Sequence, residues 1–179
     1  MKLSRFSLFG VLLCCGSWTV DVSALEEVPH PVTAELIAEH ASIQPGGTTC
    51  IGVHFELEDG WHIYADPPGD AGLPTTIAWS GGCATFDITQ WPQARSFEEP
   101  GNIRTFGYED SVVAYATLHG ICQYYVVDET TKILVQAKVR WLACREICIP
   151  DSANLELTLP VSLHAPAFST HAQLFEQTE

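Results

Sequence analysis

Apolar and polar residues alternate along several stretches of the chain, and this period of two constrains the fold more than any other feature. The longest stretch runs from Ile133 to Trp141, where Gln136, Lys138 and Arg140 separate apolar positions. Because successive side chains of a β-strand point to opposite faces of a sheet, this pattern predicts a half-buried strand. The same reasoning predicts strands over residues 32–38, 51–57 and 155–159, and shorter ones over 75–79, 84–88, 112–118 and 123–127.

Turn-forming residues separate the predicted strands. Proline, glycine, serine, asparagine and aspartate gather at residues 44–47, 66–70, 80–82 and 99–102, and such clusters favour turns. No long stretch before residue 164 has the apolar periodicity of a helix. About seven or eight strands with regular turns predict an all-β fold, an immunoglobulin-like antiparallel β-sandwich, with a closed barrel as the alternative.

The N-terminus is organised like a secretory signal. Lys2 and Arg5 precede an apolar run that ends at Cys15, and small residues up to Ala24 offer a cleavage site. We therefore expect a signal peptide over residues 1–24 and one sandwich domain over residues 25–163. The remaining tail, residues 164–179, is expected to form a loop or a short helix packed on the sandwich.

The apolar run of the signal also bears on membrane attachment. It is much shorter than the roughly 20 residues that span a bilayer, and no later apolar run is longer, so we expect no membrane span in the mature chain. Lipoprotein anchoring at Cys15 is the alternative to cleavage after Ala24. The small residue that usually precedes an acylated cysteine is missing, which favours cleavage and a periplasmic location.

The charge of the chain excludes some partners. Lysine and arginine number 8 against 22 aspartate and glutamate residues, which gives a formal net charge of −14. Such a chain repels nucleic-acid backbones and anionic lipid headgroups. We expect no nucleic-acid partner, and the acidity has a plain interpretation as a source of solubility.

Five of the seven cysteines belong to the expected mature chain, because Cys14 and Cys15 lie in the signal. The five are Cys50, Cys83, Cys122, Cys144 and Cys148. An odd number cannot pair completely, so an oxidising compartment would leave a free thiol or an intermolecular bond.

The close pair, Cys144 and Cys148, is the main candidate for chemistry. The three residues between them fit a tight loop that brings the two Cα atoms to the roughly 5.5 Å typical of a disulfide. So short a loop constrains the unfolded chain little, which favours a redox role over a structural one. Arg145 would stabilise a thiolate and Glu146 would oppose it, so charge does not rank the two thiols. A small structural disulfide stays open as the alternative.

A metal site is the other chemical alternative. The cysteine pair with His62 or His54 could supply ligands for zinc or cuprous copper. No histidine is closely spaced to the pair, and His54 occupies an outward strand position. No sequence feature pairs a histidine with Cys144 or Cys148 as in a cysteine hydrolase, and no motif calls for a cofactor.

Five short segments, taken together and in order, resemble one known family. They are residues 60–64, 68–74, 90–92, 106–109 and 141–150. The resemblance is to the N-terminal periplasmic domain of the thiol:disulfide interchange protein DsbD and to related copper-sensitivity suppressor (ScsB) proteins. It covers about residues 32–161.

The resemblance implies an immunoglobulin-like fold with a redox-active cysteine pair at Cys144 and Cys148. It implies a domain that relays electrons from a membrane-embedded partner to periplasmic thioredoxin-like proteins, as a component of a protein-disulfide reductase. It further implies that Cys148 forms the intermolecular bond and Cys144 resolves it. A mobile aromatic cap over the cysteines would correspond to Phe106, Gly107 and Tyr108, with edge-strand core residues as the alternative interpretation.

The sequence departs from the family in two respects. Full-length members continue into a transmembrane and a thioredoxin-like domain, so we expect the redox partners of this chain in trans. The family pattern does not require Cys50, Cys83 or Cys122, and a structural Cys83–Cys122 bridge would leave Cys50 free. Two other functions stay open here, an envelope binding or assembly module with a structural disulfide and a copper- or zinc-binding protein.

Overall fold

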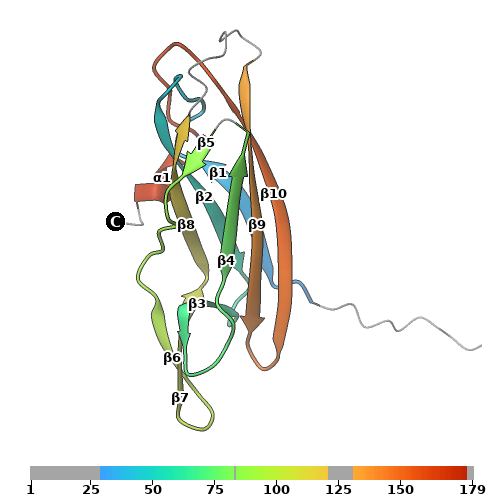
Figure 1. Cartoon of the computed structure of the whole chain (residues 1–179). Coiled ribbons are helices and arrows are strands. Elements are labelled where there is room, and N and C mark those ends of the chain that lie inside the picture. Colours follow the sequence, from blue (N-terminus) through green and yellow to red (C-terminus); the bar gives the residue numbers. More distant parts are fainter. Residues whose placement is uncertain (1–28, 83, 121–130, 177–179) are drawn as a thin grey trace, which may run out of the picture.

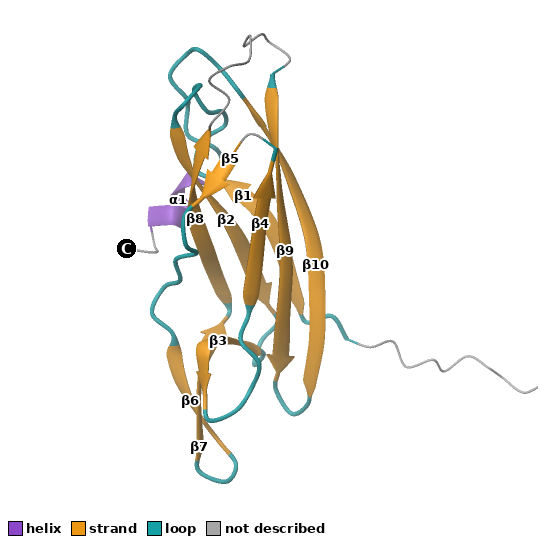
Figure 2. Ribbon diagram, viewed as in Figure 1, coloured by secondary structure: helices purple, strands orange, loops and turns teal. Residues whose placement is uncertain are grey.

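Two antiparallel β-sheets pack face to face and enclose the core (Figures 1 and 2). The computed structural model describes residues 29–82, 84–120 and 131–176. The two sheets have separate strand orders, so the fold is the predicted sandwich and the closed barrel is wrong. No helix in the described ranges has the length and apolar character needed to cross a bilayer.

The smaller sheet has four strands. In spatial order they are β1 (Val32–Ala38), β2 (Thr48–Leu57), β8 (Ser111–Gly120) and β5 (Ala84–Phe86). The larger sheet has six strands and carries the cysteine pair. They are β10 (Cys148–Pro160), β9 (Lys132–Cys144), β3 (His62–Gly69), β7 (Ile103–Glu109) and β6 (Arg95–Glu99), with β4 (Thr76–Gly81) paired to β9.

The alternating residues predicted to face inward form the core. Val135, Val139, Val53 and Phe55 are at most 1% exposed and belong to one cluster that joins the two sheets. The Phe55 ring meets the edge of Trp141 across the sandwich, with the ring centroids 5.8 Å apart. Full burial of a side chain of this size stabilises the fold by about 1.5–3 kcal/mol.

The structure contains three strands that the sequence pattern did not predict: β3, β6 and β7. β3 runs through Asp66, Pro67 and Pro68, a composition that indicated a turn. Its pairing with β7 shifts register between Tyr64 and Gly69, so the proline-rich part lies outside the regular ladder. β6 lies at the edge of the sheet and has no strict alternation of apolar residues.

The other predicted strands are present, with bounds that differ by a few residues at several ends. The strand predicted over residues 123–127 lies outside the described residues, and so do the signal peptide over 1–24 and Cys15. The described ranges therefore contain ten strands where seven or eight were predicted.

The tail carries a short helix, α1 (Ala172–Phe175), which packs on the outer face of the smaller sheet. Phe175 forms a second apolar cluster with Ile37 and Val113. Gly52 leaves room for this contact, because a Cβ there would lie 3.2 Å from the Phe175 ring. The tail thus buries residues that alternation alone places on a solvent face.

Candidate functional site

The cysteine pair closes the tip of the β9–β10 hairpin. Cys144 ends β9, Cys148 begins β10, and the two residues are paired directly across the ladder. They form a disulfide with a Cα–Cα distance of 4.1 Å. The Arg145 N–H donates a hydrogen bond to the Ile147 carbonyl, N···O 3.0 Å, which closes the intervening turn. The disulfide that the short spacing made feasible is thus present, and it closes a hairpin turn.

The two cysteines differ sharply in exposure. Cys144 is 2% exposed, whereas Cys148 and its neighbour Ile147 lie on the surface, Ile147 with 59% of its area exposed. The Arg145 guanidinium lies over the Trp61 ring, 5.0 Å from its centroid, so this cation is held against an indole. A protein partner can therefore approach the disulfide from the Cys148 side.

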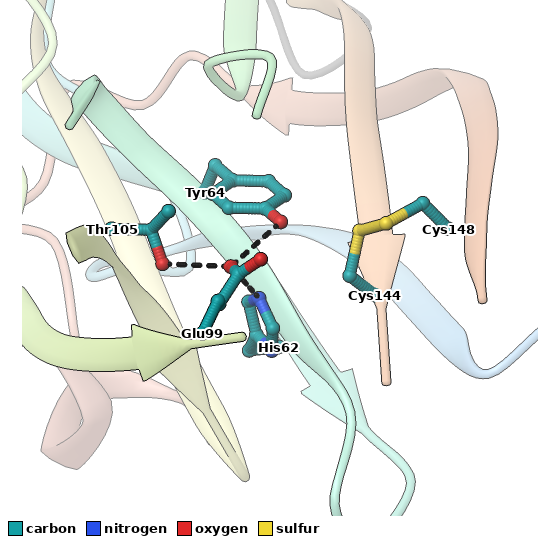
Figure 3. Close-up of a disulfide and its surroundings, with 6 residues drawn as sticks. All are labelled: His62, Tyr64, Glu99, Thr105, Cys144 and Cys148. Carbon is teal, nitrogen blue, oxygen red and sulfur yellow. Dashed lines mark hydrogen bonds and ion pairs between the residues drawn. A yellow bond between two sulfur atoms is a disulfide. The ribbon is translucent and has the colours of Figure 1, made fainter. Parts of the chain in front are cut away.

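His62 is the cross-strand neighbour of Cys144. It begins β3, the strand between β7 and β9, and it pairs with Glu109 on one side and Cys144 on the other. Directly opposed residues share one face of a sheet, with Cβ atoms about 4.5–5.5 Å apart. Glu109, His62 and Cys144 thus form a row across the outer face of the larger sheet. Figure 3 shows the His62 ring turned toward Glu99, on the strand next to the one that carries Cys144.

A carboxylate is fixed next to His62. Glu99 Oε1 accepts hydrogen bonds from the Tyr64 hydroxyl at 3.2 Å and the Thr105 hydroxyl at 2.9 Å. The same oxygen lies 4.0 Å from Nε2 of His62 (Figure 3). Because Tyr64 and Thr105 are both buried, the carboxylate is held toward the imidazole.

Aromatic rings cover the imidazole. Phe97 of β6 stacks on His62 with a centroid distance of 4.7 Å, and Tyr64 meets the ring edge-on at 5.0 Å. The side chain of His62 is consequently only 12% exposed. Gly107 belongs to β7, which lies between β3 and β6. A Cβ at Gly107 would be 3.4 Å from the Phe97 ring and would overlap the Ile63 carbonyl. The absence of a side chain at Gly107 lets Phe97 reach across β7.

Burial controls the ionisation of this cluster. Burial lowers the pKa of His62, and the opposing effects of Glu99 and Glu109 are smaller. Burial, and then the Glu99 carboxylate, raise the pKa of Tyr64 to about 12. At neutral pH the disulfide form therefore has a neutral His62, whose buried Nε2 makes no hydrogen bond. The contact with Glu99 becomes an ion pair only when the imidazole is protonated.

Phe106, Gly107 and Tyr108 lie in β7, which is separated from β9 by β3. Tyr108 belongs to the core, donates its hydroxyl to the Pro92 carbonyl at 3.1 Å and stacks on Trp91. Phe106 is half-buried and packs against the same core. The structure thus places both rings toward the interior, on the opposite face from His62. A role as a mobile cap stays a prediction.

Sequence reasoning missed Phe97 and Glu99 as neighbours of the site. No local pattern marks them, because both come from β6 and reach the site only through its pairing with β7. The sequence does point to His62 and Tyr64, because residues 60–64 form one of the segments that resemble the family. At the level of sequence, His62 is a candidate only as a metal ligand, and Tyr64 has no role of its own.

His54 and Cys50 lie on the smaller sheet, away from the cluster around His62. His54 lies on the smaller sheet, where its ring contacts the Ser111 hydroxyl at 2.8 Å. Across ranges 29–82, 84–120 and 131–176, no three His, Cys, Asp or Glu side chains gather as metal ligands would. Cys50 is a free thiol, and burial together with Glu39 raises its pKa to about 11. Cys83 and Cys122 lie outside the described residues.

Fold and site together define an immunoglobulin-like sandwich with a disulfide at a hairpin tip, one sulfur covered and one open. A family model described as the N-terminal part of thiol:disulfide interchange protein DsbD matches residues 32–160. The chain belongs to this DsbD N-terminal family.

One solved structure shows the same fold, and a second gives a weaker match. The N-terminal periplasmic domain of ScsB from Proteus mirabilis matches with a TM-score of 0.58 and 21% identity, over 83% of this chain and 53% of that one. The present chain thus spans about half the length of that domain. The DsbD N-terminal domain of Neisseria meningitidis in its reduced form matches with a TM-score of 0.39 and 13% identity, over 74% and 89% of the two chains. A search of the curated proteins found no match.

Proposed function

We propose that the chain is an exported thiol:disulfide interchange domain. It relays electrons from a membrane-embedded donor to periplasmic thioredoxin-like proteins through a reversible Cys144–Cys148 disulfide. The observation that carries this proposal is the disulfide at the tip of the β9–β10 hairpin, with Cys144 covered and Cys148 exposed, inside a family match over residues 32–160. The signal-like N-terminus supports export to the periplasm.

Reduction of the domain takes two exchange steps. A donor thiolate attacks the exposed sulfur of Cys148, the disulfide breaks, and Cys144 leaves as a thiolate. The second thiol of the donor then attacks the mixed disulfide and releases Cys148. The donor ends as a disulfide and the domain as a dithiol, so two electrons have moved.

Delivery to the acceptor uses the same two exchange steps, with the reduced domain as the attacking dithiol. The Cys148 thiolate attacks an acceptor disulfide and forms a mixed disulfide. Cys144 then attacks the Cys148 sulfur, which restores the internal disulfide and releases the reduced acceptor. The exposure difference supports this division of roles because, of the two residues in the pair, Cys148 is the exposed one and Cys144 is buried.

Trapping the mixed disulfide tests the proposal. A Cys144→Ser variant has no resolving thiol, so it should accumulate a covalent complex with a thioredoxin-like protein offered in its disulfide form. Cys148→Ser should give little or none. A Cys50→Ser variant serves as the control and should turn over as the natural chain does. Trapping is read by non-reducing electrophoresis and mass spectrometry of the linked peptides.

Two outcomes would count against the proposal. A natural chain whose disulfide stays oxidised at every physiological ratio of thiol to disulfide would be a structural clip. Equal trapping by Cys144→Ser and Cys148→Ser would remove the assigned roles.

A further inference from the structure

The row Glu109–His62–Cys144 on the outer face of the larger sheet suggests a specific task for His62. We propose that His62 delivers a proton to Cys144 when its sulfur leaves the disulfide and removes that proton when Cys144 resolves the mixed disulfide, with Glu99 as the counter-charge. This inference rests on the proposed function, because it assigns a residue to the exchange step.

The need for such a group follows from the burial of Cys144. When a partner attacks Cys148, the negative charge appears on the covered sulfur, since Cys144 is 2% exposed. A thiolate in an apolar environment is costly unless a positive charge or hydrogen-bond donor compensates it. His62 is the titratable side chain paired with Cys144 across the ladder.

One ring nitrogen of His62 has no structural hydrogen bond. This nitrogen is the buried Nε2, which has no hydrogen-bond partner in the disulfide form. Buried polar atoms of folded proteins are nearly always satisfied, and an exception often marks a functional site. The Glu99 carboxylate lies 4.0 Å from this nitrogen, and hydrogen bonds from Tyr64 and Thr105 fix its position. A protonated His62 would therefore form an ion pair with Glu99 without a rearrangement of the carboxylate.

The charged and titratable groups around His62 come from every strand beside it. Glu99 and Arg95 lie on β6, Glu109 on β7, Tyr64 on the same strand and Cys144 on β9. Arg95 forms an ion pair with Glu109, N···O 3.0 Å, which leaves Glu99 as the carboxylate nearest to the imidazole.

The exchange conserves both electrons and protons. The partner thiol gives its proton to solvent and attacks Cys148 as a thiolate, so its sulfur is oxidised as the new bond forms. The Cys144–Cys148 bond breaks and Cys144 is reduced. Solvent returns one proton to Cys144 through His62. In the resolving step the imidazole takes this proton and the Cys144 thiolate attacks the Cys148 sulfur. The bond between Cys148 and the partner breaks, and the partner leaves as a thiolate that takes a proton from solvent.

The pH dependence of reduction tests the inference. The probe is dithiothreitol, and its second-order rate constant with the oxidised chain is divided by its thiolate fraction at each pH. Protonated His62 speeds the step, so the corrected rate should rise as pH falls below the ordinary histidine pKa of 6.5, because burial places the pKa of His62 below that value. His62→Gln should flatten the profile and remove an acceleration of roughly a hundredfold.

Two further variants separate proton transfer from packing. Glu99→Gln keeps an oxygen for Tyr64 and Thr105 but removes the charge that raises the pKa of His62, so the rise should move to lower pH. His54→Gln removes a histidine of the smaller sheet and should leave the profile unchanged. Circular dichroism checks that each variant is folded.

The outcomes are distinct for the two proposals. A folded His62→Gln with the same pH profile as the natural chain overturns the role of His62, and so does a uniform, pH-independent loss of rate. In either case the trapping experiment with Cys144→Ser still decides the proposed function by itself. If His62→Gln does not fold, an unshifted profile in Glu99→Gln overturns the inference.

Discussion

At the scale of single residues, the site depends on close packing around one histidine. His62 is covered by Phe97 and Tyr64, and its neighbour Glu99 is held by two hydroxyl groups. Gly107 makes this packing possible, because β7 approaches β3 so closely that the Ile63 carbonyl occupies the position of a side chain. A glycine in a strand interior often marks such an approach of one backbone to another.

Gly107→Ala should therefore be destabilising. The added methyl group would overlap the Ile63 carbonyl and crowd Phe97, and overpacking of this kind costs about 1–3 kcal/mol. Urea unfolding measures the change in the free energy of unfolding. Gly82→Ala is the matched control, because a Cβ at Gly82 meets no atom within 4 Å. Equal stability of the two variants would show that β7 can move away from β3 at no cost.

At the scale of elements, each sheet is completed by a segment distant in sequence. The β6–β7 hairpin brings Phe97 and Glu99 to the site from the edge of the larger sheet. The helix α1 covers the outer face of the smaller sheet with Phe175. Figure 1 places α1 away from the β9–β10 turn, so this helix contributes packing without touching the disulfide.

Phe175→Ala should lower stability and leave the redox chemistry unchanged. Loss of this buried ring exposes Ile37 and Val113, and truncation of a buried phenylalanine costs about 3–5 kcal/mol. Urea unfolding gives the stability, and equilibration with glutathione gives the reduction potential. Leu163→Ala, at a side chain 70% exposed, is the control and should change neither. A shifted potential in Phe175→Ala would show that the tail and the disulfide are coupled.

At the scale of the whole molecule, the disulfide lies at one end of the sandwich, outside the main apolar cluster. β9 and β10 pair over their full length, and both sheets contribute to one apolar cluster. A disulfide that closes so short a loop removes little entropy from the unfolded chain. This architecture is compatible with the proposed change of oxidation state.

Reduction of the disulfide should accordingly leave the protein folded. The chain-entropy relation gives a loss of about 2 kcal/mol for a loop of this size, a small part of what the core supplies. Circular dichroism and urea unfolding of the oxidised and reduced chains measure the difference, and the double variant Cys144→Ala/Cys148→Ala reproduces the reduced state without reductant. Unfolding on reduction would show that the bond has a structural role.

Local patterns in the sequence determined much of the fold and the position of the cysteine pair. Alternation along β1, β2, β8 and β9 predicted those strands, because one face of a strand must be apolar to be buried. The three-residue spacing predicted the Cys144–Cys148 disulfide as feasible, because the ends of so short a loop are necessarily close.

Tertiary structure alone decided what surrounds the disulfide. Phe97 and Glu99 reach His62, the cross-strand neighbour of Cys144, through the pairing of four strands, β6, β7, β3 and β9. No local pattern encodes that order. Strand pairing also decides that the Phe106 and Tyr108 rings point toward the core. Alternation puts both rings on one face, but strand register decides which face is buried, because a shift by one residue exchanges the two.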